Sequence, residues 1–336
     1  MLKSPTKAEE DELARIEGIV KEKSIEYLKC FDLRDYLFPQ IAAEQIDKKG
    51  MAEDFNTFCS QESNVLVRTC IGKIWARDKG LSFDYDSSIF ANYVFWITMF
   101  AGTKRKEAFW ELLSRQSQYE YILGHENGAL YRGDTMNSWS TTVNEFIRVC
   151  GNEYVFGHRG RYIPADYQEW YEFLSVPANY KRDLPGYITE FMNVVYTIGN
   201  ILPVPCTPSS FNKRRSSAVK DYWDLTLLAI YNYYHLAPGK NNWILEYKEW
   251  LNIFGTGQNG WDKFVKCTFM NPFVYKCGDH FGPPKPLWQE HFTKNRLPRT
   301  PEQFKQFFVN AKSCILERGE LIASATKTGW ICPVSL

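Results

Sequence analysis

The chain has 336 residues, of which 44% are hydrophobic and 16% aromatic, so a sizeable core is possible and global disorder is excluded. Lys and Arg number 40 against 39 for Asp and Glu, a net charge of +1 that disfavours a nucleic-acid binder driven by phosphate neutralisation. The nine cysteines are irregularly spaced and include no CxxC, which favours reduced thiols in a cytosol over a disulfide framework.

No segment indicates secretion or membrane insertion. Residues 1–12 are charged and lack the apolar stretch of a signal peptide. The longest apolar run, residues 93–101, is much shorter than the roughly 20 residues that span a bilayer. We therefore expect a cytoplasmic protein with no membrane partner.

Apolar residues at helical spacing dominate the first part of the chain. Residues 7–29 are expected to form one amphipathic helix, with acidic residues in its first turns and lysines in its last. Further helices are expected over the ranges 52–76, 88–100 and 104–118. A short extended segment at 129–131 precedes a helix that is expected to begin at Asp134 or Thr135 and to stop at Gly151.

The middle of the chain mixes helices with one long loop. A short aromatic helix is expected over 167–174, and another is expected to follow Pro185 and end at Gly199 in a left-handed conformation. Residues 202–217 are rich in Pro and Ser and are expected to form a loop. The clearest helical pattern then begins at Asp221 and reaches Tyr234.

The last part of the chain is also mainly helical. Two helices and a Gly/Pro loop are expected over 243–254, 261–269 and 277–286, respectively. The final helix has a strong start, because Thr300 can cap it, Pro301 suits its first position and Gln303 completes a capping box. Since strand-type alternation is scarce, we expect a compact, mainly α, multi-helix protein with a few short extended segments.

Amide, guanidinium and carboxylate groups gather on both sides of the expected start of the helix at Asp221. Asp221 is expected to accept first-turn N–H groups, and Asp224 shares its face and is expected to pair with Arg214 or Arg215. One interpretation is a buried network that fixes the 202–217 loop onto the helix. The other is an anion pocket formed by Arg215, Asn212 and the helix start. The two acids oppose a free anion, so the network is the preferred interpretation.

Three functional hypotheses follow from this cluster. The first is a binding or regulatory protein whose partner is a small anionic ligand. Its polar pocket is lined by Arg132, Asn212, Arg215, Asp221 and Asp224. The second is a hydrolase or transferase acting on a phosphate-containing molecule, with His125 or Asp224 as the candidate catalytic group that handles protons. The third is an RNA-binding factor that uses Lys213 to Arg215, although the overall charge does not favour nucleic acid.

No motif points to a cofactor or a metal. The chain has no GxxxxGK[ST], GxGxxG or HExxH sequence, so no cofactor is expected. Cys267, Cys277 and His280 lack the close spacing of a structural zinc site and a clear fourth ligand. Whether the protein is an enzyme stays open at this point.

Six segments stand in a fixed order between Tyr121 and Ile322. They are Tyr196-Thr197-Ile198-Gly199, Asn212 with Arg215, Asp221 with Asp224-Leu225-Thr226-Leu227, Trp250-Leu251-Asn252-Ile253-Phe254, Gly260-Trp261 with Phe264, and Pro301 to Arg318. In this order they resemble an uncharacterised bacterial family, a domain of unknown function. Ser216 stands where the family pattern has Gly, so the local backbone is expected to differ here.

The resemblance implies the organisation of the chain but no activity. It implies an N-terminal helical region over residues 1–120, a helical core over 121–323 and a C-terminal tail over 324–336. The N-terminal region is expected to pack against the core.

Overall fold

The computed structural model describes residues 7–34, 64–78, 131–156, 167–205, 209–236, 243–292 and 297–328. The helices in these ranges are α1 (Lys7–Glu22), α2 (Ile25–Lys29), α5 (Val65–Asp78), α8 (Trp139–Cys150), α9 (Tyr167–Leu174), α10 (Gly186–Met192), α11 (Phe211–Val219), α12 (Trp223–His235), α13 (Lys248–Asn252), α14 (Gly257–Cys267) and α15 (Pro301–Thr328). The strands are β1 (Tyr131–Thr135), β2 (Ile201–Pro205), β3 (Val274–Cys277) and β4 (His280–Pro284), and they form two small antiparallel sheets. The mainly α prediction is confirmed.

Several expected elements fall outside the described residues. These are the helices at 88–100 and 104–118 and the proposed boundary at residue 120. The division into an N-terminal region, a core and a tail therefore stays a prediction. None of the helices that are described combines the length and the hydropathy needed to cross a bilayer.

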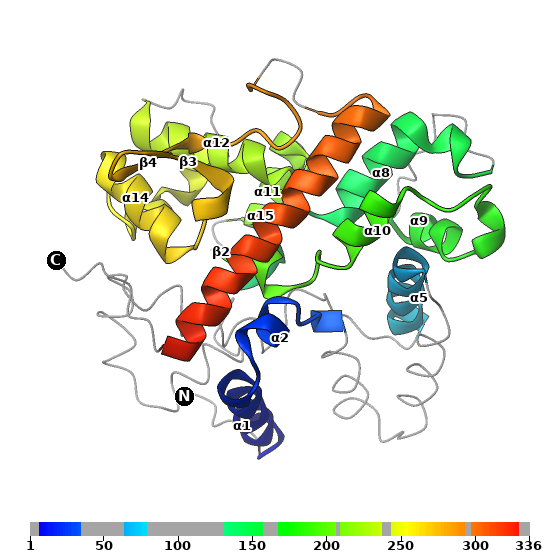
Figure 1. Cartoon of the computed structure of the whole chain (residues 1–336), viewed down its shortest axis with the longest axis horizontal. Coiled ribbons are helices and arrows are strands. Elements are labelled where there is room, and N and C mark those ends of the chain that lie inside the picture. The colour runs from blue at the N-terminus through cyan, green and yellow to red at the C-terminus, as the bar shows by residue number, and fades with distance from the viewer. Residues whose placement is uncertain are drawn as a thin grey trace.

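Helix α15 runs obliquely across the molecule and contacts elements from distant parts of the chain, among them α2, α8 and α10 (Figure 1). Its start matches the expected capping sequence, because the hydroxyl of Thr300 accepts the backbone N–H of Gln303 at 3.3 Å. The side chain of Gln303 reaches one residue further than expected and accepts the N–H of Arg299 at 2.8 Å. Pro301 occupies the first helical position, where its missing N–H costs no hydrogen bond.

Gly199 allows the chain to lie directly against α15. A Cβ at this position would lie 2.0 Å from the carbonyl oxygen of Ile315. Gly199 belongs to a 3-10 turn, Ile198–Asn200, and α10 has already ended at Met192. The expected left-handed helix end at Gly199 is therefore wrong, because this glycine serves close packing between segments rather than a cap.

Arg318 of α15 also contacts the segment that contains Gly199. Its side chain is fully buried and donates from Nε to the carbonyl of Thr268 at 2.9 Å and from a terminal nitrogen to that of Gly199 at 2.8 Å. The same terminal nitrogen donates to the carbonyl of Ile201 at 2.8 Å. Burial lowers the pKa of Arg318 to about 9. The guanidinium group thus ties the start of β2 to α15.

The N-terminal segment is two helices rather than the single helix expected over 7–29. The first helix ends before Ser24, whose hydroxyl accepts the N–H of Tyr27 at 3.1 Å and caps α2. Helix α2 packs on α15, and α5, which starts within the expected range 52–76, packs on α9. The aromatic helix expected over 167–174 is confirmed as α9.

Two expected boundaries change because β1 pairs with β2. Asp134 and Thr135 belong to β1 rather than to a helix, and they lie opposite Leu202 and Ile201 of β2. Helix α8 begins only after Ser138, although it does end at Gly151 as expected. The expected loop over 202–217 is also wrong, since β2 covers its beginning and α11 its end. All five residues of β2 are buried, which overrides the turn-forming composition of this stretch.

The C-terminal third forms a second group of helices around α12 and α14. Helix α12 begins at Trp223, two residues after the expected start at Asp221, and the expected helix at 243–254 is a 3-10 turn (Trp243–Tyr247) followed by α13. Helix α14 begins at Gly257, earlier than expected. The expected Gly/Pro loop at 277–286 contains most of the β3–β4 hairpin, which packs on α12 and α14.

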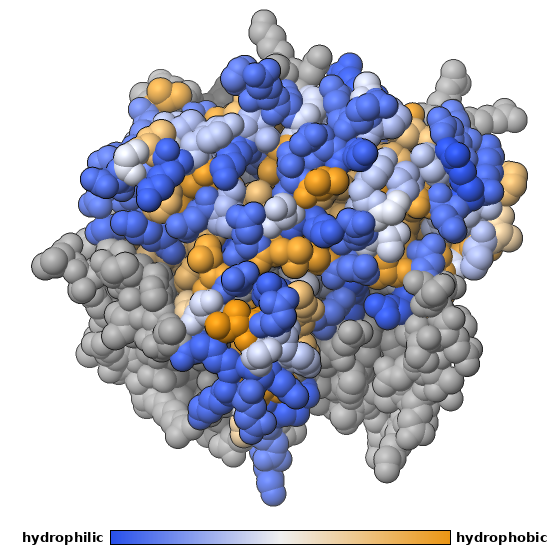
Figure 2. Space-filling view, viewed as in Figure 1, coloured by the Kyte–Doolittle hydropathy of each residue, from blue (hydrophilic) through white to orange (hydrophobic). Residues whose placement is uncertain are grey.

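Buried aromatic side chains from α8, α11, α12, α14 and α15 belong to one hydrophobic core. On the face seen in Figure 2, hydrophilic residues predominate on the described surface, with apolar residues scattered among them. This distribution is the ordinary one for a protein surface exposed to water.

Candidate functional site

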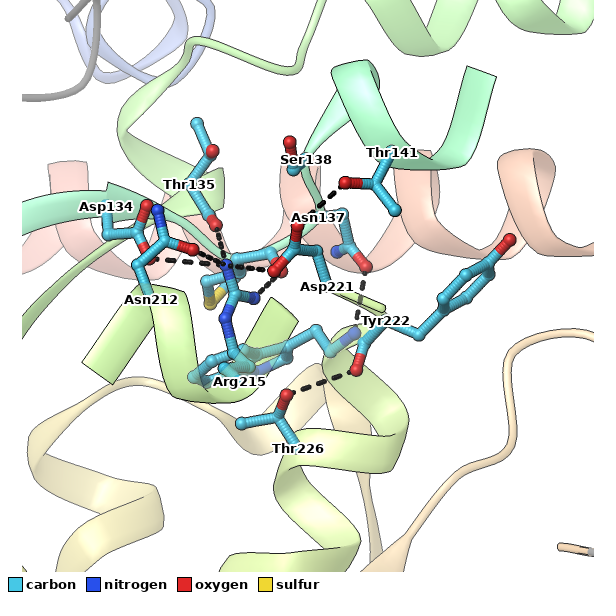
Figure 3. Close-up of polar contacts among 12 residues, drawn as sticks. Asp134, Thr135, Asn137, Ser138, Thr141, Asn212, Arg215, Asp221, Tyr222 and Thr226 are labelled. Carbon is cyan, nitrogen blue, oxygen red and sulfur yellow. Dashed lines mark hydrogen bonds and ion pairs between the residues drawn. The ribbon is translucent and has the colours of Figure 1, made fainter. Parts of the chain in front are cut away.

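Arg215 is the centre of a buried polar network between α11 and β1 (Figure 3). One terminal nitrogen of its guanidinium group donates to the carbonyl of Thr135 at 2.8 Å and to Oδ2 of Asp134 at 3.2 Å. The same nitrogen lies 3.3 Å from Oδ1 of Asn212, one turn earlier on α11. The other terminal nitrogen donates to the carbonyl of Met136. Asn212 and Arg215 were expected on a loop, and their place on a helix puts both on one face.

Asp221 joins this network from the turn between α11 and α12. Its Oδ1 lies 3.5 Å from the guanidinium group of Arg215, and its Oδ2 accepts the hydroxyl hydrogen of Thr141 at 2.7 Å. Lys220 and Asp221 have φ values of 56° and 58°, the left-handed region that side chains other than Gly occupy at a cost. Asp221 therefore does not cap α12 as expected; it holds a strained turn against α8.

The start of α12 is capped by the side chain of Asn137, which Asn200 holds in place. Oδ1 of Asn137 accepts the N–H of Trp223 at 3.3 Å, where α12 begins. Asn200 accepts the N–H of Asn137 at 3.1 Å and donates to its carbonyl at 3.1 Å. Both asparagines are fully buried. Sequence reasoning did not select Asn137, Asp134 or Thr141, because their partners are distant along the chain.

Asp224 takes part in a separate contact. Its Oδ2 accepts the N–H of Leu287 at 3.0 Å, and its Oδ1 accepts the N–H of Leu225 at 3.0 Å. Burial raises the pKa of Asp224 to about 6. The expected ion pair of Asp224 with Arg214 or Arg215 is wrong, because β1 supplies Asp134 to Arg215 and Arg214 pairs with Glu246.

A cavity of about 260 Å³ lies beside the Arg215 network. The described residues that line it come from α5, β1, α8, α9, β2, α11 and the adjoining turns. They are Lys73, Asp134, Thr135, Ser138, Trp139, Ser140, Tyr171, Tyr196, Val204, Pro205, Ser210, Asn212 and Lys213. Of the side chains expected in a pocket, Asn212 is in this set, whereas Arg215, Asp221 and Asp224 are not. Asn212 and Asp134 thus belong to both the cavity wall and the network.

The first turns of two helices meet at this cavity. Ser138 precedes α8 and Ser210 precedes α11, and neither makes a side-chain cap hydrogen bond. Neither helix has an acidic residue in its first turn. The first N–H groups of a helix have no intrahelical acceptor and carry a partial positive charge. Residues at both helix starts are therefore among those that line the cavity.

The charged side chains on the wall reinforce this polarity. Lys73 and Lys213 contribute two ammonium groups, while Asp134 is the one carboxylate among the described lining residues. Asp134 pairs with the guanidinium group of Arg215, which Asp221 also approaches to 3.5 Å. Among the described side chains of the wall, ammonium groups therefore outnumber carboxylates, which favours an anion over a cation.

The remaining candidates do not join this site. Arg132 lies in β1 opposite Val204, with its side chain outside the described part of the structure, and His125 is outside it altogether. In the basic run at Lys213, Arg214 is paired with Glu246 and Arg215 is buried, so the run is not a continuous patch. Within the described ranges, no group of three or more His, Cys, Asp or Glu side chains is placed to hold a metal ion.

Comparison with known proteins found one family that matches part of the chain. Residues 162–322 match the model of a family of unknown function, DUF6994. No curated protein and no solved structure matches the chain. The match confirms the expected resemblance to an uncharacterised family, while the six-segment pattern and the bacterial source stay predictions. It includes α11 and β2 but not β1 or the start of α8, so the cavity combines matched and unmatched segments.

Proposed function

We propose that this protein binds a small, hydrophilic anion in the cavity between the first turns of α8 and α11, as a binding or regulatory protein. The observation that carries the proposal is the meeting of the starts of α8 and α11, neither with a side-chain cap, and of the exposed Lys213 around one cavity. Helix N-termini bind anions through their free N–H groups, and lysine ammonium groups add charge. The hydroxyl-bearing residues on the wall, such as Ser138, Ser140 and Ser210, suit a ligand that forms many hydrogen bonds.

The role proposed for the Arg215 network is to hold this site in shape. Arg215 fixes Asp134 and Asn212, which stand on the cavity wall, while its own guanidinium group stays buried. This differs from the sequence hypothesis, in which Arg215 itself held the anion. It makes Arg215 a positioning residue.

The proposal favours binding over catalysis. A hydrolase or transferase needs a proton-handling group beside the anion. Asp224, the described candidate for that role, is buried against Leu287 and does not line the cavity. RNA is also not favoured, because Lys213 is the one member of the basic run that lines the cavity.

We also propose a bacterial source and a cytoplasmic location. The support for the source is the resemblance of the six segments described above. The support for the location is that the described cysteines, including the exposed Cys30 and Cys277, are free thiols, as expected in a reducing compartment.

The test is a thermal-shift and calorimetry panel of phosphate, sulfate, carboxylates and phosphorylated metabolites. A ligand at 100 times its Kd stabilises the native state by about 2.7 kcal/mol, so the melting temperature should rise measurably. Lys213→Ala is expected to reduce this rise. Lys266→Ala is the matched control, because Lys266 is an exposed helical lysine that does not line the cavity. Equal loss in both variants, or no shift with any anion, would overturn the proposal.

A further inference from the structure

We infer that His235 is doubly protonated in this fold and that its proton closes a pH-sensitive link from the end of α12, through α14, to the β3–β4 hairpin. His235 is half-buried in the last turn of α12, where the helix macrodipole favours a cation. It is not among the described residues that line the cavity, so this link is independent of the proposed anion site. The observation behind it is that both ring nitrogens of His235 face oxygen atoms.

The amide of Gln258 has one orientation that its neighbours allow. Its nitrogen donates to Oδ1 of Asp262 at 2.9 Å and to the carbonyl of Phe281 at 3.0 Å. A carboxylate oxygen and a carbonyl oxygen can only accept, and the same Oδ1 also accepts the N–H of Phe281 at 2.8 Å. Turning the amide over would place its oxygen against both acceptors. The amide oxygen therefore faces His235.

Both ring nitrogens of His235 consequently lie beside acceptors. Nε2 lies 2.8 Å from Oε1 of Gln258, and Nδ1 lies 2.9 Å from the carbonyl oxygen of Tyr231. A neutral imidazole has one N–H and one bare nitrogen, so it would satisfy one contact and place two lone pairs together at the other. The imidazolium form has two N–H groups and satisfies both. The hydrogen-bonding pattern thus requires a positive charge on His235.

The same side chains hold the β3–β4 hairpin onto α14. Gln258 and Asp262 together pair the carbonyl and the N–H of Phe281 in β4. Loss of the Nε2 proton of His235 leaves Oε1 of Gln258 without its donor. If the amide turns to donate to the bare Nε2, its bonds to Asp262 and Phe281 break. Deprotonation therefore loosens the hairpin over the pH range in which imidazoles titrate.

Asp262 is the charged group that His235 reaches through Gln258. It is buried, and its Oδ2 lies 2.6 Å from Nδ1 of the exposed His280 in β4. One carboxylate thus lies between two imidazoles, and its negative charge favours the proton on His235. Further charged side chains on the elements that pack against α12 are Lys263 and Lys266 of α14, Glu246 of the Trp243–Tyr247 turn, and Lys213, Arg214 and Arg215 of α11.

The experiment compares the melting temperature of the full chain with that of His235→Phe at two pH values. Phenylalanine keeps a ring against Tyr231, whose ring centroid lies 4.0 Å from that of His235, but it has no N–H. Imidazoles are ordinarily charged at about pH 5.5 and neutral at about pH 8.5, so the stabilisation is present at the lower pH and lost at the higher one. The variant should lose about 2 °C more at pH 5.5 than at pH 8.5. An equal loss at both pH values would overturn the inference.

Hydrogen exchange of the hairpin amides tests where the proton acts. After correction for the intrinsic effect of pH, exchange should be faster at pH 8.5 than at pH 5.5 in the wild type and equally fast at both in His235→Phe. His280→Gln is the matched control, because His280 contacts the same carboxylate but not Gln258. The pH effect should persist in this control. If it disappears in His280→Gln and persists in His235→Phe, the inference is wrong.

Nitrogen NMR of the wild-type imidazoles does not depend on the folding of a variant. The ring of His235 is identified by its contact with Tyr231. At pH 5.5 both of its nitrogens should be protonated, and both N–H protons should exchange slowly with water because each is hydrogen-bonded. A bare ring nitrogen on His235 at this pH, or rapid exchange of both protons, would overturn the inference.

Discussion

The guanidinium group of Arg215 lies 3.2 Å from Oδ2 of Asp134 and so fastens α11 to β1. Asp221 approaches the same guanidinium group to 3.5 Å from the following turn. All three side chains are buried, with exposed fractions of 1%, 7% and 6% for Arg215, Asp134 and Asp221. One guanidinium group therefore faces two acids that have lost most of their water.

Arg215→Ala is expected to destabilise the protein by about 3–5 kcal/mol, because it removes the buried guanidinium group that Asp134 and Asp221 both face. The measurement is the free energy of unfolding from chemical denaturation at pH 7. Arg214→Ala is the matched control, since the adjacent Arg214 pairs with Glu246 on the surface and such pairs contribute about 0–1 kcal/mol. Equal losses in the two variants would show that the Arg215 network does not stabilise the fold.

Asp224 is expected to make stability depend on pH. Its pKa is raised from 3.8 to about 6 by burial, so the native state binds the proton more tightly than the unfolded state. The stabilisation from protonation is present below pH 4 and is lost as the pH rises through about 6. The difference in pKa corresponds to about 3 kcal/mol.

The variant Asp224→Asn removes this titrating group and should flatten the profile. Relative to the wild type, the free energy of unfolding of the variant should increase by about 2 kcal/mol between pH 4 and pH 7. Asp279→Asn serves as the control, because Asp279 is exposed in the β3–β4 turn. Parallel profiles for Asp224→Asn and the wild type would contradict the assignment of this pH dependence to Asp224.

Gly199→Ala tests the contact between the 3-10 turn and α15. The added Cβ would lie 2.0 Å from the carbonyl oxygen of Ile315, and neither backbone segment can easily move. Overpacking of this kind costs about 1–3 kcal/mol and sometimes more. Gly186→Ala is the control, since nothing lies within 4 Å of its added Cβ, and it should leave the melting temperature unchanged or higher.

Ser210→Asp tests separately how the start of α11 contributes to stability and to anion binding. Aspartate is a good N-cap, so the substitution should maintain or raise stability by up to about 1 kcal/mol. The new carboxylate would repel an anion in the cavity. It would also accept the N–H groups at the start of α11 that an anion would otherwise bind, so anion affinity should fall about tenfold or more. Ser210→Ala is the control for loss of the hydroxyl alone. Unchanged affinity in Ser210→Asp would mean that the anion does not sit at the start of α11.

Local signals identified several elements without help from the fold. The period of apolar residues predicts α9 and α12, and the sequence Thr300, Pro301, Gln303 predicts the start of α15. These signals work because the interacting groups are within one turn of each other along the chain. The clustering of Arg215 with Asn212 and Asp221 was also visible, since all three lie close together in sequence.

The cavity forms only through contacts between residues that are far apart in the sequence. Asp134 is 81 positions from Arg215, and the β1–β2 pairing that brings them together is not encoded in either strand alone. In that pairing, the beginning of the Pro- and Ser-rich stretch over 202–217 is a buried strand. The starts of α8 and α11, which follow the two strands in sequence, lie at one cavity. Composition and periodicity report what a segment prefers in isolation, whereas the pairing of buried strands depends on partners that only the folded chain supplies.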